Sequence, residues 1–396
     1  MPCRRLLLSW AVLLCARPGH GCRWAVFASS TLEPRPSSAA AELFLHSEHS
    51  LAVQSYSEPF LPYLNRSSRW DPAQSVMRNH KCNRDGWGLG WAGAGSEAGD
   101  GQMLQVHRSA APATTESVPS VELREFLAQA RGRMAMGHIR AATEGANLEL
   151  NTHPFLFADH GGGRIIWMHN GGISNIDAVR IQLLERLPPH IQEQITGSTD
   201  SELAGGIFVA ELEAARHVGQ EGAAALETAM RRMLALITEP DRHRDATYAL
   251  LHLSRSAAEA PSLLGPFDES RCVPGLASSL NFAASDGHNV VATRFRSCDA
   301  EDPPTLYVAW SAPAGQHGGG AYHHHPGPTC SFSDDEDEMS SLPLPCLLAE
   351  LAVGKLTASA GQIWVASEPL DRTNGARWAT TGACGYNRQC AQQMCR

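Results

Sequence analysis

Four clusters of polar residues and glycines stand out in the sequence, because polar side chains are costly to bury unless they have partners or a function. The clusters are Gly137-His138-Ile139-Arg140-Ala141-Ala142-Thr143, Asn151-Thr152-His153-Pro154-Phe155, His169-Asn170-Gly171-Gly172-Ile173 and Gly197-Ser198-Thr199-Asp200-Ser201-Glu202. A fifth cluster is Asn83-Arg84-Asp85-Gly86-Trp87-Gly88. Three of the clusters fall at the ends of predicted strands or at the start of a predicted helix, where sites are commonly built.

Two charged residues in these clusters can bind opposite ends of an amino acid, although each also has a structural interpretation. Arg140 ends a predicted strand, and its planar guanidinium can hold a carboxylate by two parallel hydrogen bonds or form a structural ion pair. Asp200 can pair with a substrate ammonium or cap the helix that starts there. Taken singly, the structural interpretation is the simpler one for both residues.

The pair Asn170-Gly171 follows a predicted strand and supplies a side-chain amide beside an unobstructed backbone N–H. Together these donors can stabilise an oxyanion. The same dipeptide is also the commonest signal for a hairpin turn. His138 and His153, taken one at a time, are better interpreted as core histidines, or as residues that support a site, than as ligands.

The elements that must position these clusters can be read from the hydrophobic pattern. Short runs rich in β-branched, aromatic and aliphatic residues predict strands at Arg23–Ala28, Gly88–Ala92, Met134–Arg140, Arg164–His169, Ala246–Leu253, Asn289–Phe295, Thr305–Trp310 and Gln362–Ser367. Helical periodicity predicts helices at Val121–Arg131, Asn175–Leu187, Asp200–Arg216 and Gly222–Ile237, the third capped by Thr199 or Asp200. Strands, then helices, then strands again indicate a layered α+β architecture.

Composition excludes some classes of function. The chain has 396 residues and a net charge of −9, and its basic residues form no stripe, so nucleic-acid and anionic-membrane binding are poorly supported. Gly86 to Gly90 lacks the lysine of a phosphate-binding loop and predicts a turn. The run His323-His324-His325 predicts an exposed insertion rather than a metal site. The cysteines of the C-terminal tail lack zinc-ligand spacing. We therefore expect no metal.

Taken in order, the clusters resemble the motifs of a known family. Cys22-Arg23-Trp24, the segment His49–Ser55 and the five clusters above are similar to the successive motifs of class II glutamine amidotransferases. The resemblance runs from Cys22 to about Pro369, and it is the order of the set that makes it specific. It is nearest to the stand-alone branch, which includes the amidotransferase-like subunit of a eukaryotic glutathione-degrading complex and the ergothioneine-pathway γ-glutamyl hydrolases.

The resemblance implies a fold and a set of roles. The fold is a four-layer αββα sandwich with antiparallel sheets, as in other N-terminal-nucleophile (Ntn) hydrolases. The implied roles are nucleophile for Cys22, oxyanion hole for Asn170 and Gly171, and substrate binding for Arg140, Thr143, His153 and Asp200. Within that set, Arg140 matches the residue that binds the α-carboxylate and Asp200 the residue that holds the α-amine. No cofactor is implied.

The nucleophile of this family works only at the start of a chain. A thiol with a pKa near 8.5 needs a base, and an N-terminal cysteine carries one, since its own α-amine has a pKa of roughly 8. An internal cysteine has an amide nitrogen instead. Most relatives begin Met-Cys, whereas Gly21 precedes Cys22 here. The mechanism therefore requires removal of residues 1–21.

Residues 1–21 have the layout of a secretory signal peptide. Arg4 and Arg5 precede the apolar run Leu6–Ala16, and glycines occupy the −3 and −1 positions relative to Cys22. That run is shorter than the roughly 20 residues of a membrane span. We expect a secretory or secreted protein, and the alternative is a cytoplasmic protein whose gene model has been extended. Eight cysteines beyond the leader and Cys22, and the sequon at Asn65, agree weakly with export.

We expect one class II glutamine amidotransferase-type domain at residues 22–370, with a disordered insertion at 311–345, followed by an irregular cysteine-containing tail at 371–396. No second module follows to accept ammonia, which favours γ-glutamyl hydrolysis over a complete amidotransferase synthase. The expected substrate is a small γ-glutamyl compound (glutamine, glutathione or an analogue), and the resemblance implies glutathione or a related compound. The alternatives are a glutaminase that supplies ammonia to a separate protein and a non-catalytic γ-glutamyl-binding subunit. The resemblance also suggests a metallopeptidase-like partner subunit. The leaving group and the oligomeric state are not fixed by the sequence.

Overall fold

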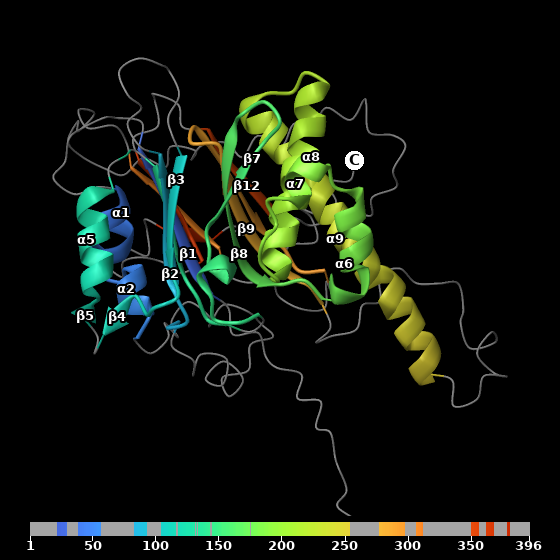
Figure 1. Ribbon diagram of the computed structural model, residues 1–396, viewed down its shortest axis with the longest axis horizontal. Helices are drawn as coiled ribbons and strands as arrows, with labels where there is room; N and C mark the ends of the chain where they lie inside the picture. The colour runs from blue at the N-terminus through green and yellow to red at the C-terminus, as the bar shows by residue number, and fades with distance from the viewer. Residues whose placement is uncertain are drawn as a thin grey trace, which may run out of the picture.

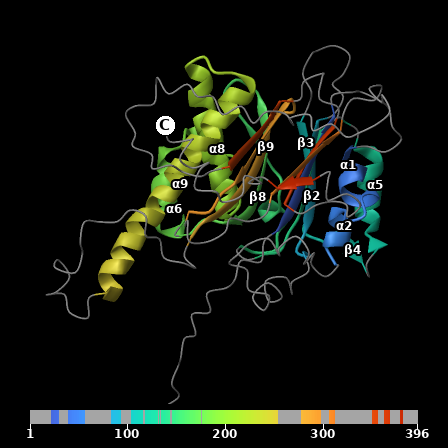
Figure 2. The ribbon, with the colours of Figure 1, turned by 180° about the vertical axis from the view of Figure 1, so that it is seen from behind.

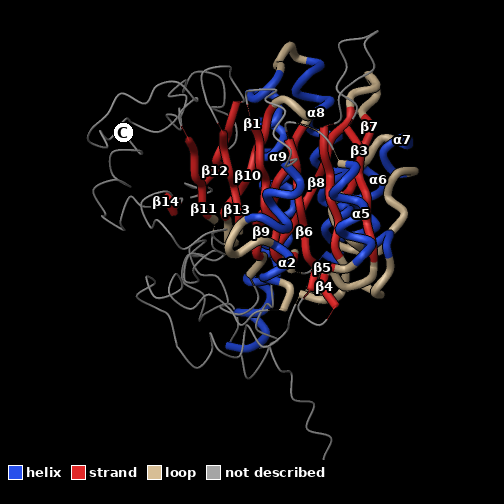
Figure 3. Tube along the Cα trace, turned by 90° about the vertical axis from the view of Figure 1, so that its left-hand side faces the viewer, coloured by secondary structure: helices blue, strands red, loops and turns tan. Residues whose placement is uncertain are grey.

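The protein forms four layers, with two β-sheets packed face to face between two layers of helices (Figure 1). The computed structural model describes residues 22–29, 39–56, 83–92, 104–115, 118–130, 132, 134–142, 145–174, 176–253, 277–297, 306–311, 350–355, 362–367 and 378–380. Viewed from the side in Figure 3, the strands run alongside one another across the molecule. The predicted α+β fold, an αββα sandwich with antiparallel sheets, is confirmed.

The first sheet has seven antiparallel strands in the order β14-β11-β13-β1-β6-β2-β3. Their bounds are β1 Arg23–Ser29, β2 Trp87–Ala92, β3 Leu104–Ser109, β6 Met134–Ile139, β11 Tyr307–Ser311, β13 Gln362–Ala366 and β14 Trp378–Thr380. Strand β1 is the fourth of the seven and pairs with β13 on one side and β6 on the other. The residue just before β1 therefore emerges from the middle of the sheet.

The second sheet has five strands in the order β12-β10-β9-β8-β7. Their bounds are β7 Phe155–Ala158, β8 Arg164–Gly172, β9 Ser279–Ser285, β10 Asn289–Arg294 and β12 Glu350–Lys355. A two-stranded ribbon, β4 Thr114–Thr115 with β5 Val118–Pro119, lies outside both sheets.

The helices divide between the two outer faces (Figures 1 and 2). The seven-stranded sheet is covered by α1 Ala39–Ala41, the π-helix Glu42–His46, α2 Leu51–Gln54 and α5 Val121–Gln129. The five-stranded sheet is covered by α6 Ile176–Arg186, α7 Pro189–Gln192, α8 Asp200–His217 and α9 Gly222–Leu253. A short 3₁₀ helix, Glu149–Asn151, precedes β7.

Strand β1 shows why the sequence folds into buried layers. Trp24, Val26 and Ala28 point into the core between the sheets, whereas Ala25 and Phe27 point into the core under α1 and α2. Alternate residues of a strand face opposite sides, so a strand buried on both faces is apolar throughout. This is why the predicted run at Arg23–Ala28 carries no polar residue after its first position.

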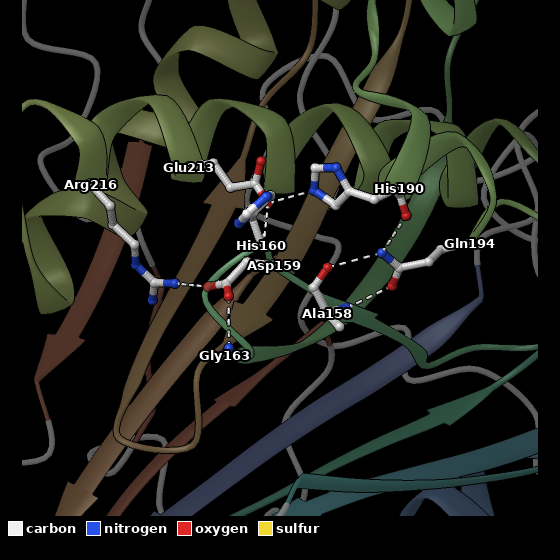
Figure 4. A network of polar contacts seen from close by, with 8 residues as sticks. All are labelled: Ala158, Asp159, His160, Gly163, His190, Gln194, Glu213 and Arg216. Carbon is white, nitrogen blue, oxygen red and sulfur yellow. Dashed lines mark hydrogen bonds and ion pairs between the residues drawn. The ribbon is translucent and has the colours of Figure 1, made fainter.

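A network of polar contacts fastens the turn between β7 and β8 to the helices, and we call it the hairpin network (Figure 4). It comprises Ala158, Asp159, His160, Gly163, His190, Gln194, Glu213 and Arg216. Arg216 on α8 donates to the Asp159 carboxylate. Glu213, also on α8, accepts from the His160 N–H at 2.6 Å and from His190 Nε2 at 2.8 Å.

Most predicted elements are confirmed to within a few residues, and one is wrong. The strand predicted at Ala246–Leu253 is instead the end of α9, which extends away from the sandwich (Figures 1 and 2). An eight-residue apolar run does not by itself distinguish a helix from a strand, and its alanines and leucines are strong helix formers.

Strands β3, β7, β9 and β12 were not predicted. Strand β14 lies within the segment 371–396 that was expected to be irregular. The leader 1–21, Thr143, the Asn65 sequon and residues 312–345 lie outside the described residues, as do all cysteines except Cys22. Within the described part of the chain, no helix combines the length and the apolar character needed to span a bilayer.

Candidate active site

Cys22 lies one residue before β1, next to the end of β6. Arg23 pairs with Ile139, so the backbone that follows β6 passes beside the cysteine. The Cys22 thiol donates to the carbonyl oxygen of Ala141 over a distance of 3.6 Å and is half-buried. Two residues further on, Trp24 is anchored, because its indole N–H donates to the Asn281 carbonyl of the other sheet at 3.1 Å. The Cys22 thiol is therefore held in a defined position, beside the residues that follow β6.

Charged groups of both signs act on this thiol. Burial raises the pKa of Cys22 above its ordinary value, and the hydrogen bond to the Ala141 carbonyl, with the positive charges of Arg140 and Arg23, opposes that rise. The negative charge of Asp200 raises the thiol pKa further. The charges of the Arg140 guanidinium and the Asp200 carboxylate therefore both influence the pKa of the Cys22 thiol.

Arg140 is held by the turn that precedes β2. Its backbone N–H donates to the Gly86 carbonyl at 2.9 Å, and its carbonyl accepts from the Asp85 N–H at 3.0 Å. The Asp85 carboxylate accepts from the Ala142 N–H at 2.8 Å. The Arg140 side chain is 3% exposed, and its Nη1 donates to Ala146 and Asn147. Residues of the fifth sequence cluster therefore support Arg140. Asp85 takes part in this support, a role that the sequence did not reveal.

Asn170 and Gly171 lie inside β8, where they pair with Asn281 and Leu280 of β9. The hairpin turn considered from the sequence is therefore not formed. Gly171 has φ +150°, and a Cβ placed there would come within 1.7 Å of the Ser279 carbonyl oxygen, so only glycine fits. The Asn170 side chain is 5% exposed and has no hydrogen bond to another described residue. Its amide donors are available to a ligand.

Asp200 is the first residue of α8 but not its cap. Thr199 caps the helix, since its side chain accepts from the Glu202 N–H at 3.2 Å. The Asp200 carboxylate instead accepts from the Ile173 N–H at 2.7 Å through Oδ2 and from the Ser201 hydroxyl at 3.0 Å through Oδ1. Asp200 is thereby bound to the backbone just beyond Asn170 and Gly171.

The loop before α8 is ordered by two residues of the predicted clusters. Glu202 accepts from the backbone N–H groups of Thr196 and Gly197, at 3.1 and 2.6 Å. Asn151 accepts from the Ser198 N–H at 3.1 Å and donates to the Ala146 carbonyl at 3.1 Å, the same carbonyl that Arg140 binds. The clusters at 151 and 197 thus join the loops that carry Arg140 and Asp200.

Three buried histidines lie near these residues, and we call His138, His153 and His169 the histidine cluster. They are 0%, 4% and 1% exposed, as a core interpretation of His138 and His153 requires. The His169 ring lies on the side of its sheet that faces α8, against Ser201 and Phe282. The His138 and His153 rings are 4.3 Å apart, and His138 Nε2 lies 3.3 Å from the His169 carbonyl oxygen. Neither nitrogen of His153 has a hydrogen-bond partner among the described residues. Its predicted substrate contact stays a prediction.

Burial lowers the pKa of all three histidines. The pKa of His138 falls to about 3, chiefly through burial and also through the charge of Arg140. Burial and the neighbouring charged groups lower the pKa of His153 well below its ordinary value. Burial also lowers the pKa of His169, whereas the Asp200 carboxylate and the Ser279 carbonyl support its charged form. His169 is the member of the cluster that hydrogen bonds join to Asp200, through the Ser201 hydroxyl.

Residues 71–250 match the family model of class-II glutamine amidotransferases. That range contains Arg140, Asn170, Gly171 and Asp200, on the elements described above. Residues 71–250 are thus similar to a class II glutamine amidotransferase domain. Cys22 lies outside the matched range.

Individual relatives agree with this assignment. The chain is 28% identical over 246 residues to the probable glutamine amidotransferase DUG3 of Saccharomyces cerevisiae, covering 61% of this chain and 59% of that protein. It is 31% identical over 143 residues to an amidophosphoribosyltransferase of Synechococcus elongatus, covering 36% of this chain and 26% of that protein. The chain therefore spans less than two-thirds of the length of either relative.

Solved structures include the glutamine aminotransferase class-II domain protein from Silicibacter pomeroyi. It is 19% identical, with 73% of this chain and 84% of that chain covered and a TM-score of 0.35. Glutamine phosphoribosylpyrophosphate amidotransferase from Bacillus subtilis is 14% identical, with 73% and 40% covered and a TM-score of 0.39.

Two further features of the described residues bear on the site. They contain no group of three or more histidine, cysteine, aspartate or glutamate residues arranged to hold a metal ion. A polar cavity of about 260 Å³ opens where β3 lies against β7, lined in part by Arg108, Glu149 and Gln194. None of the predicted site residues lines it, so it is separate from the thiol.

Proposed function

We propose that this protein is a γ-glutamyl amide hydrolase whose nucleophile is the Cys22 thiol. One observation carries the proposal: the thiol lies against the carbonyl of Ala141, the residue after Arg140, and the charges of Arg140 and Asp200 both act on its pKa. A free α-amino-acid head group has a carboxylate and an ammonium to match this pair. A side-chain amide at the γ position then presents its carbonyl to the sulfur.

The base in this proposal is the α-amine of Cys22, which becomes available when the peptide bond to Gly21 is cut. We propose that the leader 1–21 is the segment removed, by signal peptidase if the chain is exported. With that bond intact, the half-buried thiol has a raised pKa and faces a carbonyl oxygen, so it is a poor nucleophile. The uncut chain is expected to be inactive.

The reaction then has two halves. The amine takes the thiol proton, the sulfur attacks the γ-carbonyl carbon, and the carbonyl electron pair moves to oxygen, where Asn170 and the Gly171 N–H are proposed to meet it. Collapse expels the leaving amine, which takes the proton from the ammonium, and leaves a thioester. Water, deprotonated by the same amine, attacks the thioester and releases glutamate and the thiol.

Glutathione or a related γ-glutamyl thiol is the proposed substrate, on the resemblance to the stand-alone branch of the family. The test uses the chain that begins at Cys22 and compares its release of glutamate from glutathione with its release of glutamate from glutamine. Preference for glutamine, with ammonia release, would indicate the glutaminase alternative. Ligand binding without turnover of either compound would indicate the non-catalytic subunit and would refute the hydrolase.

A matched pair of chains tests the base. One chain begins at Cys22 and the other at Gly21, a difference of a single residue that leaves β1 and its pairing intact. Mass spectrometry establishes each N-terminus before assay. Activity should appear only in the chain that begins at Cys22, and equal activity in both would show that the α-amine is not the base.

The first prediction concerns the nucleophile itself. In the chain that begins at Cys22, Cys22→Ala should lower kcat by at least about 1,000-fold, since loss of a covalent nucleophile costs that much or more. The thiol is half-buried and makes one weak hydrogen bond, so the melting temperature should change little. Glutamate release measures the first effect and thermal unfolding the second. Turnover close to that of the unsubstituted chain would exclude Cys22 as nucleophile.

A further inference from the structure

A chain of hydrogen bonds runs from Asp200 into the histidine cluster. The Ser201 hydroxyl lies 3.0 Å from Asp200 Oδ1 and 2.9 Å from His169 Nδ1. The other ring nitrogen, His169 Nε2, lies 3.0 Å from the Ser279 carbonyl oxygen. Ser201 is 5% exposed and His169 is 1% exposed, so water does not compete freely for these groups. None of the roles proposed above uses Ser201 or His169.

Counting hydrogens shows that this chain has two arrangements. A carbonyl oxygen only accepts, so His169 Nε2 must carry a hydrogen to bond Ser279. Ser201 has a single hydroxyl hydrogen for its two neighbours. If that hydrogen goes to Asp200, His169 Nδ1 needs a hydrogen of its own, and the ring is then an imidazolium. If the ring is neutral, Nδ1 takes the hydroxyl hydrogen, and Asp200 Oδ1 receives none.

We propose that Ser201 and His169 act as positioning residues that open or close Asp200 Oδ1 to the substrate ammonium. This inference rests on the proposed function, in which Asp200 binds the α-amine. When His169 is neutral, Oδ1 is open and Oδ2 stays fixed by the Ile173 N–H. When His169 is protonated, the Ser201 hydroxyl turns to Oδ1 and competes with the ammonium, while the imidazolium repels it.

Several other groups face this array. His138 and Arg140 approach from β6 and the residue after it, His153 from the segment before β7, and Cys22 from the segment before β1. Burial keeps His138 and His153 neutral well into the acid range, since both have strongly lowered pKa values. His169 alone among the three has its charged form supported by the Asp200 carboxylate. It is therefore the histidine expected to gain a proton first.

The consequence is that the binding of the substrate α-amine by Asp200 should depend on pH. As the pH falls and His169 takes up a proton, KM should rise for substrates that carry an α-ammonium. Substrates without that ammonium should not respond in this way. The useful pair is glutamine and 4-carbamoylbutanoate, which is glutamine without its α-amine and has the same γ-amide.

The experiment uses the chain that begins at Cys22 and measures kcat and KM for both compounds from pH 5 to pH 8. For the unsubstituted chain, KM for glutamine should rise roughly tenfold toward the acid end, the size of one lost charge-assisted hydrogen bond, while KM for 4-carbamoylbutanoate stays flat. Ser201→Ala should remove most of this pH dependence and leave only the repulsion by the imidazolium, and Ser201→Thr should restore the full effect by returning the hydroxyl. A Ser201→Ala chain that keeps the full pH dependence would overturn the proposal.

A second measurement does not need turnover. Nitrogen NMR of the His169 ring in the Cys22→Ala chain should show, at pH 7.5, a neutral ring protonated at Nε2, with an Nδ1 signal that moves in Ser201→Ala. A ring protonated at Nδ1 alone would refute the switch even if the enzyme hydrolyses glutamine. If the expected tautomer is found but no γ-glutamyl compound is hydrolysed, it is the proposed function that fails.

Discussion

The histidine cluster and the hairpin network both contain histidines, yet they differ in how fully their polar atoms are hydrogen-bonded. In the hairpin network, Asp159 receives hydrogen bonds at both of its oxygens, and Glu213 receives two at one oxygen (Figure 4). In the histidine cluster, three buried ring nitrogens, on His138 and His153, have no partner among the described residues.

The difference indicates which region is built for stability and which for chemistry. A buried polar atom without a partner costs about 1–3 kcal/mol, so a region selected only for stability does not keep several of them together. The hairpin network joins a surface turn to α7 and α8 and has no such atoms among the groups drawn in Figure 4. The histidine cluster lies close enough to Arg140 and Asp200 for their charges to act on its members, and a ligand is expected at those two residues.

The largest expected effect separates a glycine of the site from a glycine of the hairpin. Gly171→Ala should unfold the chain or cost at least about 4 kcal/mol, because its Cβ would overlap the Ser279 carbonyl oxygen and its φ is +150°. Gly162→Ala is the matched control: its φ is +81°, and a Cβ there meets nothing within 4 Å. That variant should cost only about 1–2 kcal/mol, the strain of a positive φ. Chemical denaturation measures both, and equal costs would contradict the packing argument.

Asn170 and Gln194 allow the comparison to be tested in both directions. Asn170→Ala removes a side chain with no described partner, so it should spare stability but lower kcat about 100- to 1,000-fold, the usual loss for one oxyanion donor. Gln194→Ala removes hydrogen bonds to Ala158 and His190, so it should cost about 1–2 kcal/mol of stability and leave kcat unchanged. The oxyanion assignment would not survive an Asn170→Ala chain with normal kcat.

Acid should destabilise the protein through the histidine cluster. The folded pKa of each member is lowered, so below about pH 6.5 the unfolded chain binds protons that the folded chain does not. Stability is therefore lost as the pH falls through that value, by up to about 1.4 kcal/mol per pH unit for each histidine, until the folded pKa is reached. Urea denaturation at pH 7.5, 6.5 and 5.5 measures the slope. His153→Phe should make it shallower by the share of one histidine.

The smallest expected effect belongs to the charge of Glu213. Glu213→Gln keeps a carbonyl oxygen that can accept from the His160 N–H or from His190 Nε2, and it loses only the negative charge. The pair with His190 is partly exposed, so the change should cost no more than about 1 kcal/mol and should not alter KM for any substrate. Thermal unfolding and the glutaminase assay provide the two readouts. A marked change in KM would show that the two regions are coupled.

The sequence predicted the framework because most strands and helices of the sandwich have clear hydrophobic patterns. It missed β9, whose residues Ser279, Asn281 and Ser285 break the apolar run although Asn281 and Ser285 are fully buried. It missed β7 because four residues give too short a pattern. It also extended a strand prediction into the end of α9. In each case the tertiary environment, and not the local sequence, decides the outcome.

For the site, the clusters could be found from the sequence, but the separate roles of the residues within each cluster could not. Within Gly197–Glu202, Thr199 caps α8, Glu202 orders the preceding loop, and Asp200 alone faces the thiol region. Asp85 and Asn151, which hold the loops around Arg140, were noticed only as members of clusters. Such roles depend on contacts between residues far apart in the chain, as with Asp85 and Ala142, which are 57 positions apart, and Asn151 and Ser198, which are 47 positions apart. Only the folded chain shows them.

The central place of β1 has a mechanical consequence. The first residues of a polypeptide usually fray, which would be fatal to chemistry that depends on the exact location of a terminal amine. Here β1, which follows Cys22, pairs with a neighbouring strand along each edge. A new N-terminus created at Cys22 would be as immobile as the interior of the sheet. Proteolysis could therefore expose a reactive amine and still leave it in a fixed position.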